Sequence, residues 1–118
     1  MIKKTNLNYE VMKNEALIKT LNDCAEACNF CADACLEEEN VAHMISCIRT
    51  DRVCAEVCSS TAKILSMSYG PIDELLRFCV NVCSRCADEC SQHDHEHCKN
   101  CAIACTECKE ACEKILTG

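Results

Sequence analysis

The amino-acid sequence predicts an all-α protein, an antiparallel up-down-up-down bundle of four helices with a cysteine-lined core, in a single domain over residues 1–118. Three observations predict this fold. The 118 residues include 16 cysteines that recur at steps of four and three, which is the period of an α-helix. Two glycines and one proline are too few for a β fold rich in tight turns. Short linkers join the periodic segments, and helices joined in this way run antiparallel.

Turn and capping residues indicate where the helices begin and end. Asn40 and Asp94 precede the second and fourth periodic segments, where a side-chain oxygen can accept hydrogen bonds from backbone N–H groups. Gly70 suits the end of one helix, and Pro71 suits the first turn of the next. We therefore expect four helices, at about 9–38, 41–67, 71–92 and 95–116.

Each expected helix carries one block of cysteines with the same spacing. Three blocks read C-x3-C-x2-C-x3-C, and in the second helix Asp51 stands at the second position of the block. Steps of four, three and four place the thiols of a block along one face of a helix. The cysteines are Cys24, Cys28, Cys31 and Cys35 in the first helix; Cys47, Cys54 and Cys58 in the second; Cys79, Cys83, Cys86 and Cys90 in the third; and Cys98, Cys101, Cys105, Cys108 and Cys112 in the fourth.

Toward one end of the bundle the same stripe continues with mostly aliphatic residues. In an antiparallel bundle these residues meet around the Gly70–Pro71 turn, so we expect them to form an apolar plug. The residues are Leu17, Leu21, Thr61, Leu65, Ile72, Leu76 and Ile115.

At the opposite end the stripe reaches a thioether and imidazoles. The candidate metal ligands of this His/Met end are His43, Met44, His93 and His97. Core packing is the alternative role for the first two, and His95 is expected to be exposed. The run Glu37–Glu39 could raise the local concentration of cations, although a charged run in a turn is more often simply solvated.

Charge and coordination favour Cu(I) as the metal. Soft thiolates bind Cu(I), Zn(II) and iron–sulfur clusters. Zn(II) bound by four thiolates per ion would leave a large negative charge in a core of low dielectric, whereas about one Cu(I) per cysteine leaves the core neutral. A C-x3-C pair places two sulfurs on adjacent turns, which is enough for a two-thiolate site. Asp51 interrupts one such pair, so copper near Cys47 would use a cysteine from another helix, or Asp51 is not a ligand.

Other function classes have little support in the sequence. The net charge of −7, with only 12 lysines and arginines, argues against binding of nucleic acid. The N-terminal residues lack the apolar run of a secretory signal, and no apolar stretch is long enough to span a bilayer, so we expect a cytoplasmic protein without membrane contact. The chain has no P-loop, no G-x-G-x-x-G, no Glu-x-x-His pair and no Ser/His/Asp grouping, so we do not expect an enzyme.

A cysteine-lined four-helix bundle with repeated C-x3-C motifs and a His/Met end resembles the bacterial copper storage proteins, over about residues 9–116. The lack of an export signal resembles the cytosolic branch of that family. The resemblance implies Cu(I) stored by thiolates inside the bundle, entrance of copper at the His/Met end, and a homotetramer. The candidate partners are copper ions and a copper chaperone or efflux system. Two alternatives stay open: a zinc or cadmium thiolate buffer, and a metal-free bundle stapled by disulfides between helices.

Overall fold

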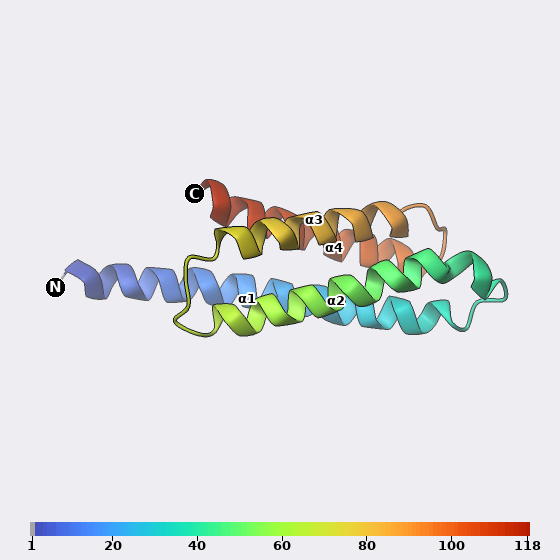
Figure 1. Cartoon of the computed structure of the whole chain (residues 1–118), viewed down its shortest axis with the longest axis horizontal. Helices are drawn as coiled ribbons and strands as arrows, with labels where there is room; N and C mark the ends of the chain where they lie inside the picture. The colour runs from blue at the N-terminus through green and yellow to red at the C-terminus, as the bar shows by residue number, and fades with distance from the viewer. Residues whose placement is uncertain (1) are drawn as a thin grey trace.

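Antiparallel helices make up the chain, as the periodicity predicts. The computed structural model describes the backbone of residues 2–118 and the side chains of residues 14–118. Its elements are α1 (Ile2–Cys35), the 3-10 turn η1 (Val41–Met44), α2 (Ile45–Leu65), α3 (Asp73–Cys90) and α4 (Glu96–Thr117). Figure 1 shows α1 paired with α2 and α3 paired with α4, with the first part of α1 projecting beyond the other helices. The molecule is elongated, about 61 Å by 21 Å by 20 Å.

The ends of the helices differ from the expected bounds in several places. α1 begins before residue 9 and ends at Cys35, because the N–H groups of the next three residues bond to carbonyl oxygens three residues back. This tighter turn includes part of the run Glu37–Glu39, whose negative charge is unfavourable at a helix C-terminus. α3 begins at Asp73 rather than Pro71, and the acidic residues of its first turn, Asp73 and Glu74, favour a helix start there.

The two expected side-chain caps are wrong. Asn40 precedes η1 rather than α2, and its side chain makes no capping hydrogen bond. The residue that precedes α4 is His95, not Asp94, and it makes no side-chain capping hydrogen bond either. Asn40 and Asp94 both lie in exposed turns at one end of the bundle. Water can satisfy the first backbone N–H groups there, so a protein cap is not required.

Thiols fill the interior over most of the length of the bundle. All 16 cysteines are buried, so the cysteine stripe faces inward on every helix, as its spacing predicts. Buried alanines flank the stripe on α1 and α2, and small side chains at such positions let neighbouring helices approach closely. These alanines are Ala25, Ala32, Ala55 and Ala62.

At the end near the Gly70–Pro71 turn the thiols give way to the expected apolar plug. It consists of the buried Leu17, Leu21, Leu65 and Leu76, with Ile72 and Ile115 packed against the core. Thr61 is also fully buried, and its hydroxyl has no hydrogen-bond partner. Burial of a leucine side chain contributes about 1.5–3 kcal/mol, so the plug stabilises this end of the bundle without any metal.

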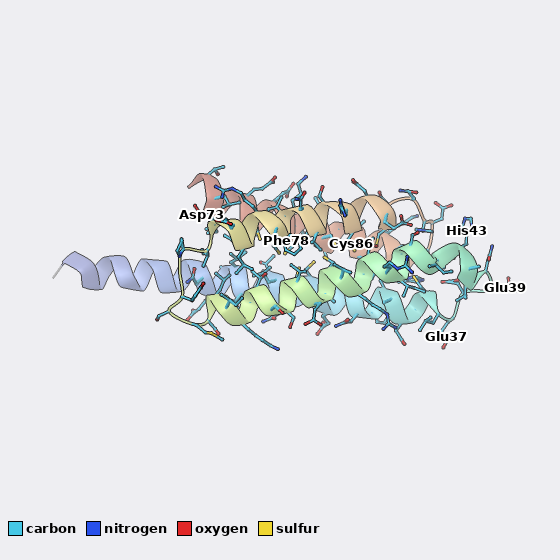
Figure 2. The ribbon with its side chains drawn as sticks, in the orientation of Figure 1. Glu37, Glu39, His43, Asp73, Phe78 and Cys86 are labelled. Atoms are coloured by element: carbon cyan, nitrogen blue, oxygen red, sulfur yellow. The ribbon has the colours of Figure 1, made fainter. Side chains whose placement is uncertain are left out.

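The opposite end of the bundle is polar. Figure 2 shows Glu37, Glu39 and His43 far from Asp73, which lies beside the plug. Within residues 2–118, no helix combines the length and the apolar composition that a membrane span requires. The helices therefore hold a core of thiols between a closed apolar end and a polar His/Met end.

Candidate metal centre

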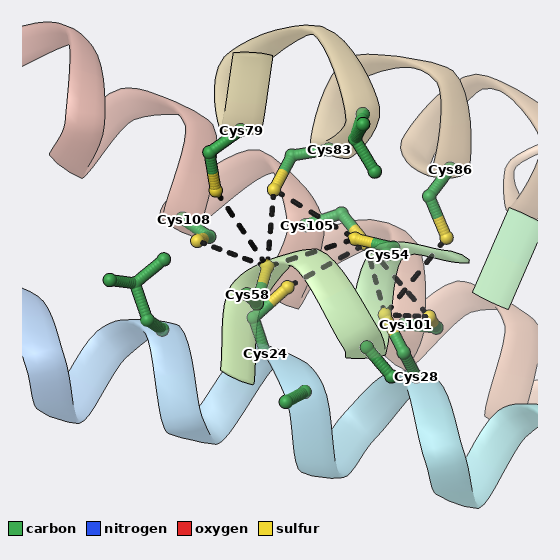
Figure 3. Close-up of a cluster of buried hydrophobic side chains, with 14 of the residues drawn as sticks. Cys24, Cys28, Cys54, Cys58, Cys79, Cys83, Cys86, Cys101, Cys105 and Cys108 are labelled. Atoms are coloured by element: carbon green, nitrogen blue, oxygen red, sulfur yellow. Dashed lines mark hydrogen bonds between the residues drawn. The ribbon is translucent and has the colours of Figure 1, made fainter. Parts of the chain in front are cut away.

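The four helices bring their thiols into contact along the axis of the bundle (Figure 3). The Sγ atom of Cys58 on α2 lies 3.6 Å from that of Cys83 on α3 and 3.9 Å from that of Cys108 on α4. On α1, the Sγ atom of Cys24 lies 3.9 Å from that of Cys105 on α4. Two thiolates that bind one metal ion at about 2.3 Å must lie within about 4.6 Å of each other. These sulfur atoms are thus already close enough to share an ion.

The Sγ–Sγ distances within a helix are similar to those between helices. The C-x3-C pair Cys54 and Cys58 has an Sγ–Sγ distance of 3.9 Å, as the spacing predicts. The Sγ atom of Cys54 is also 3.8 Å from that of Cys83, and the Sγ atom of Cys28 is 3.7 Å from that of Cys105. The sequence gives the spacing along each helix, but the register between helices depends on tertiary packing. The spacing of the cysteines therefore could not predict the contacts between helices.

Groups of four donor atoms recur along the core and share members. One group takes a cysteine from each helix: Cys24, Cys58, Cys83 and Cys108. Two more are Cys24, Cys28, Cys54 and Cys105, and Cys28, Cys86, Cys101 and Cys105. Within each group the ligand atoms all lie within 4.8 Å of one another. Since neighbouring groups use the same sulfur atoms, the thiols form one continuous set of donors rather than a series of separate sites.

Asp51 lies inside this set of thiols and is fully buried. Its Oδ1 atom accepts hydrogen bonds from the thiols of Cys86, at 3.2 Å, and Cys101, at 3.3 Å. Burial, together with these neighbouring thiols, raises the pKa of Asp51 to about 12. Without metal, this carboxyl group is therefore neutral at physiological pH. The position of Asp51 on the inward face is as the block spacing predicts, and its chemistry is set by its surroundings.

Cys47, which lacks its partner on the next turn of α2, is surrounded by thiols from the other helices. Its Sγ atom lies 3.7 Å from that of Cys90, 3.9 Å from that of Cys98 and 4.0 Å from that of Cys31. Burial raises the pKa of Cys98, and neighbouring thiols raise it further. A metal ion that binds to Cys98 must therefore displace a thiol proton that burial favours.

At the His/Met end, His97 is the imidazole that touches the thiols. Its Nδ1 atom lies 3.3 Å from the Sγ atom of Cys31 and 3.6 Å from that of Cys98. Together with Cys35 these residues form a group whose four ligand atoms lie within 4.8 Å of one another. Burial lowers the pKa of His97, but its hydrogen bonds to Cys31 and Glu38 more than offset this and raise the pKa above its ordinary value.

The other candidate ligands at this end surround an opening. Met44 is buried, His43 is exposed, and both line a cavity of about 430 Å³ together with His93 and His95. The Nε2 atom of His93 lies 2.9 Å from a carboxylate oxygen of Glu89. The rings of His43 and His93 meet edge to face, with centroids 6.4 Å apart. Of the four candidates, the structure thus places His97 against the thiols and the other three around the cavity, with Met44 also packed in the buried core.

His95 is only partly exposed, because its ring contacts His97 and Glu38. The ring of His95 stacks on that of His97 with centroids 5.4 Å apart, and its Nδ1 atom lies 3.4 Å from the Oε2 atom of Glu38. The same oxygen lies 2.8 Å from the Nε2 atom of His97. Glu38 and His97 are 59 residues apart, so their contact depends on how two turns meet. The only signal for it in the sequence was the placement of Glu37–Glu39 at this end.

Comparisons with known proteins agree with this geometry. The family model described as copper storage protein matches residues 10–117. A cytosolic copper storage protein from Streptomyces lividans, solved with five coppers, has a TM-score of 0.89 and 43% identity, over 94% of this chain and 98% of that chain. The same protein loaded with 10 copper equivalents gives a TM-score of 0.87 and 44% identity, over 91% of this chain and 86% of that chain. The cysteine-rich protein YhjQ of Bacillus subtilis is 40% identical over 102 residues, which is 86% of this chain and 94% of YhjQ.

The buried carboxyl group of Asp51 predicts a specific dependence of stability on pH. The pKa of Asp51 is raised from 3.8 to about 12 on folding, so its contribution to stability is complete below pH 4 and declines as the pH rises toward 12. Asp51→Asn has no such proton to lose. As the pH rises from 5 to 7.5, the metal-free variant should therefore gain free energy of unfolding relative to the wild type, by up to about 3 kcal/mol. Urea unfolding followed by circular dichroism at both pH values, under reducing conditions, measures the difference. If the free energy of unfolding changed equally with pH in the two proteins, the carboxyl group of Asp51 would not be the cause of the pH dependence.

Proposed function

The chain belongs to the copper storage protein family, and from that premise we propose that its sixteen cysteines hold many Cu(I) ions, about one per cysteine, as thiolates inside the bundle. Copper is the cargo of this protein. The thiol core supplies the ligands, and the His/Met end is where ions enter and leave. His97 is a ligand at that end, while His43, Met44 and His93 line the opening.

The observation that carries this proposal is the continuous set of buried, shared thiols. Each thiol that binds Cu(I) loses its proton, so one ion per thiolate leaves the core without net charge. The short Sγ–Sγ distances between helices, from 3.6 Å upward, let one sulfur contact ions on both sides of it along the axis. A neutral copper–thiolate core avoids the large cost of burying uncompensated charge.

The two alternatives are less consistent with the arrangement of the thiols. A zinc or cadmium buffer with four thiolates per divalent ion would leave uncompensated negative charge in this buried core, which one Cu(I) per thiolate avoids. A disulfide-stapled bundle would bring its cysteines together in separate pairs, whereas the Sγ atom of Cys58 lies within 3.9 Å of the Sγ atoms of Cys54, Cys83 and Cys108. Sharing of thiols between neighbouring ions is what copper storage requires.

The burial of the donors also supports storage rather than catalysis. The cysteine side chains are at most 1% exposed, so the core can admit an ion but not an organic substrate. We propose a cytoplasmic location, since the Streptomyces lividans relative is a cytosolic protein. A copper chaperone or an efflux system would then be the donor or acceptor of the stored ions.

Exposed apolar side chains support association into a homotetramer. Val53 on α2 and Phe78 on α3 are about half exposed, and Ile103 on α4 and Phe30 on α1 are more exposed still. Apolar surface of this kind is often covered by another protein chain. We propose that these faces meet in a tetramer. Analytical ultracentrifugation of the metal-free protein should give a mass of four chains, and a mass of one chain would exclude this assembly.

Removal of thiols should lower the number of bound copper ions in proportion. The double variant Cys54→Ser, Cys58→Ser keeps the shape of α2 but removes two donors at the centre of the core. We expect its capacity to fall by about two Cu(I) ions per chain in an anaerobic titration against a chromophoric chelator. Ser59→Ala, Ser60→Ala alters the next turn of the same helix without touching a thiol, so it should retain full capacity. Unchanged capacity in the cysteine variant would contradict storage by these thiolates.

Changes at the His/Met end should alter the rate of loading rather than the capacity. Replacement of His43, Met44, His93 and His97 with alanine removes the ligands that line the opening but only one donor from the thiol core. Stopped-flow mixing with Cu(I) should show slower uptake and a nearly unchanged final number of ions. Met67→Ala, Tyr69→Ala, at the plug end, provides the control and should load normally. A large loss of capacity with a normal initial rate would rule out entrance at the His/Met end.

A further inference from the structure

Glu38 connects the two turns at the His/Met end through a single carboxylate oxygen. It follows α1, whereas His95 and His97 lie at the start of α4. Its Oε2 atom lies 2.8 Å from the Nε2 atom of His97 and 3.4 Å from the Nδ1 atom of His95. The side chains of Glu38 and His97 are 27% and 12% exposed, so this contact is partly shielded from water. The carboxylate thus contacts Nε2, the nitrogen of the His97 ring that faces away from the thiols.

This contact determines which nitrogen of His97 carries the proton. A carboxylate only accepts hydrogen bonds, so the Nε2 atom of His97 must carry hydrogen to bond to it. In the neutral ring the lone pair is then on Nδ1, which faces the Sγ atoms of Cys31 and Cys98 at 3.3 Å and 3.6 Å. Metal-binding histidines commonly donate their other N–H to a carboxylate, which fixes the ring and strengthens the ligand.

We propose that Glu38 is a positioning residue, which orients His97 so that its Nδ1 atom, with the thiols of Cys31, Cys35 and Cys98, forms the first site that an incoming Cu(I) ion meets. This inference rests on the proposed function, since it specifies how the His/Met end receives copper. When Cu(I) binds, a thiol releases its proton to solvent and the ion joins that sulfur to Nδ1. The N–H···O contact to Glu38 stays in place throughout.

The position of Glu38 separates this role from simple attraction of cations. Glu37 and Glu39 carry the same charge on either side of it, but both are exposed, whereas Glu38 is half-buried against the imidazoles. If the run only attracted copper by its charge, the three residues would be interchangeable. If Glu38 orients His97, its ability to accept a hydrogen bond is what matters, and an amide oxygen can replace it in part.

Three variants distinguish these roles: Glu38→Ala, Glu38→Gln and the matched control Glu39→Ala. Two-bond ¹H–¹⁵N correlation spectra of the metal-free protein report which nitrogen of His97 is protonated. Stopped-flow mixing under anaerobic conditions, with less than one Cu(I) ion per chain, measures the rate at which the first site takes up its ion. We expect Glu38→Ala to mix the two tautomers of His97 and to slow this first uptake about tenfold. Glu38→Gln should retain most of both properties, and Glu39→Ala should resemble the wild type.

Each outcome decides between the two roles. An unchanged tautomer in Glu38→Ala, or an equal loss of uptake rate in Glu39→Ala and Glu38→Gln, would overturn the positioning role. His97→Ala separates this inference from the proposed function. If His97→Ala slows the first uptake but Glu38→Ala does not, the inference is wrong and the His/Met entrance stands. If neither variant slows the first uptake, both the inference and the entrance through His97 are wrong. The total number of bound ions tests storage itself and should be unaffected by the Glu38 variants.

Discussion

Thiols contact one another across the axis of the bundle, and this contact decides which side chains the core can hold. Four helices can bring sulfur atoms within 3.6 Å of one another only if the side chains between them are small. Cysteine lines the axis and alanine flanks it on α1 and α2, so bulky aliphatic residues are absent from most of the described core. A thiol core loses the burial that leucine would supply, about 0.8 kcal/mol for each missing CH₂. The apolar plug at the closed end is therefore where the conventional hydrophobic stabilisation is concentrated.

The second constraint is electrostatic and concerns the net charge of the core. A buried core must be neutral before copper arrives and neutral after it has bound. Burial favours the first condition at thiols such as Cys35 and Cys98, whose pKa values it raises above their ordinary range. Exchange of one proton for one Cu(I) meets the second. Asp51 fits the same rule, because its carboxyl group is neutral among the thiols and adds no charge to the metal-free core.

Much of this arrangement follows from periodicity along single helices. The inward face of each cysteine block, the apolar plug and the gathering of His43, Met44, His93 and His97 at one end were predicted in this way. Contacts between helices, such as Cys58 with Cys83, could not be, because they depend on the relative register of helices that meet only in the folded chain. The expected caps at Asn40 and Asp94 were wrong for a related reason, since exposed turns can rely on water. The link between Glu38 and His97 joins two separate turns, and no local pattern encodes it.

We expect a preformed helical bundle to take up about one Cu(I) ion per cysteine. Anaerobic titration of the reduced, metal-free protein with Cu(I) against a chromophoric chelator, with circular dichroism followed in parallel, tests it most directly. We predict uptake close to the number of cysteines, into a protein whose helical signal is complete before the first ion binds. Saturation at about four to six ions, as separate four-thiolate sites would give, or a large gain of helix on loading, would contradict it.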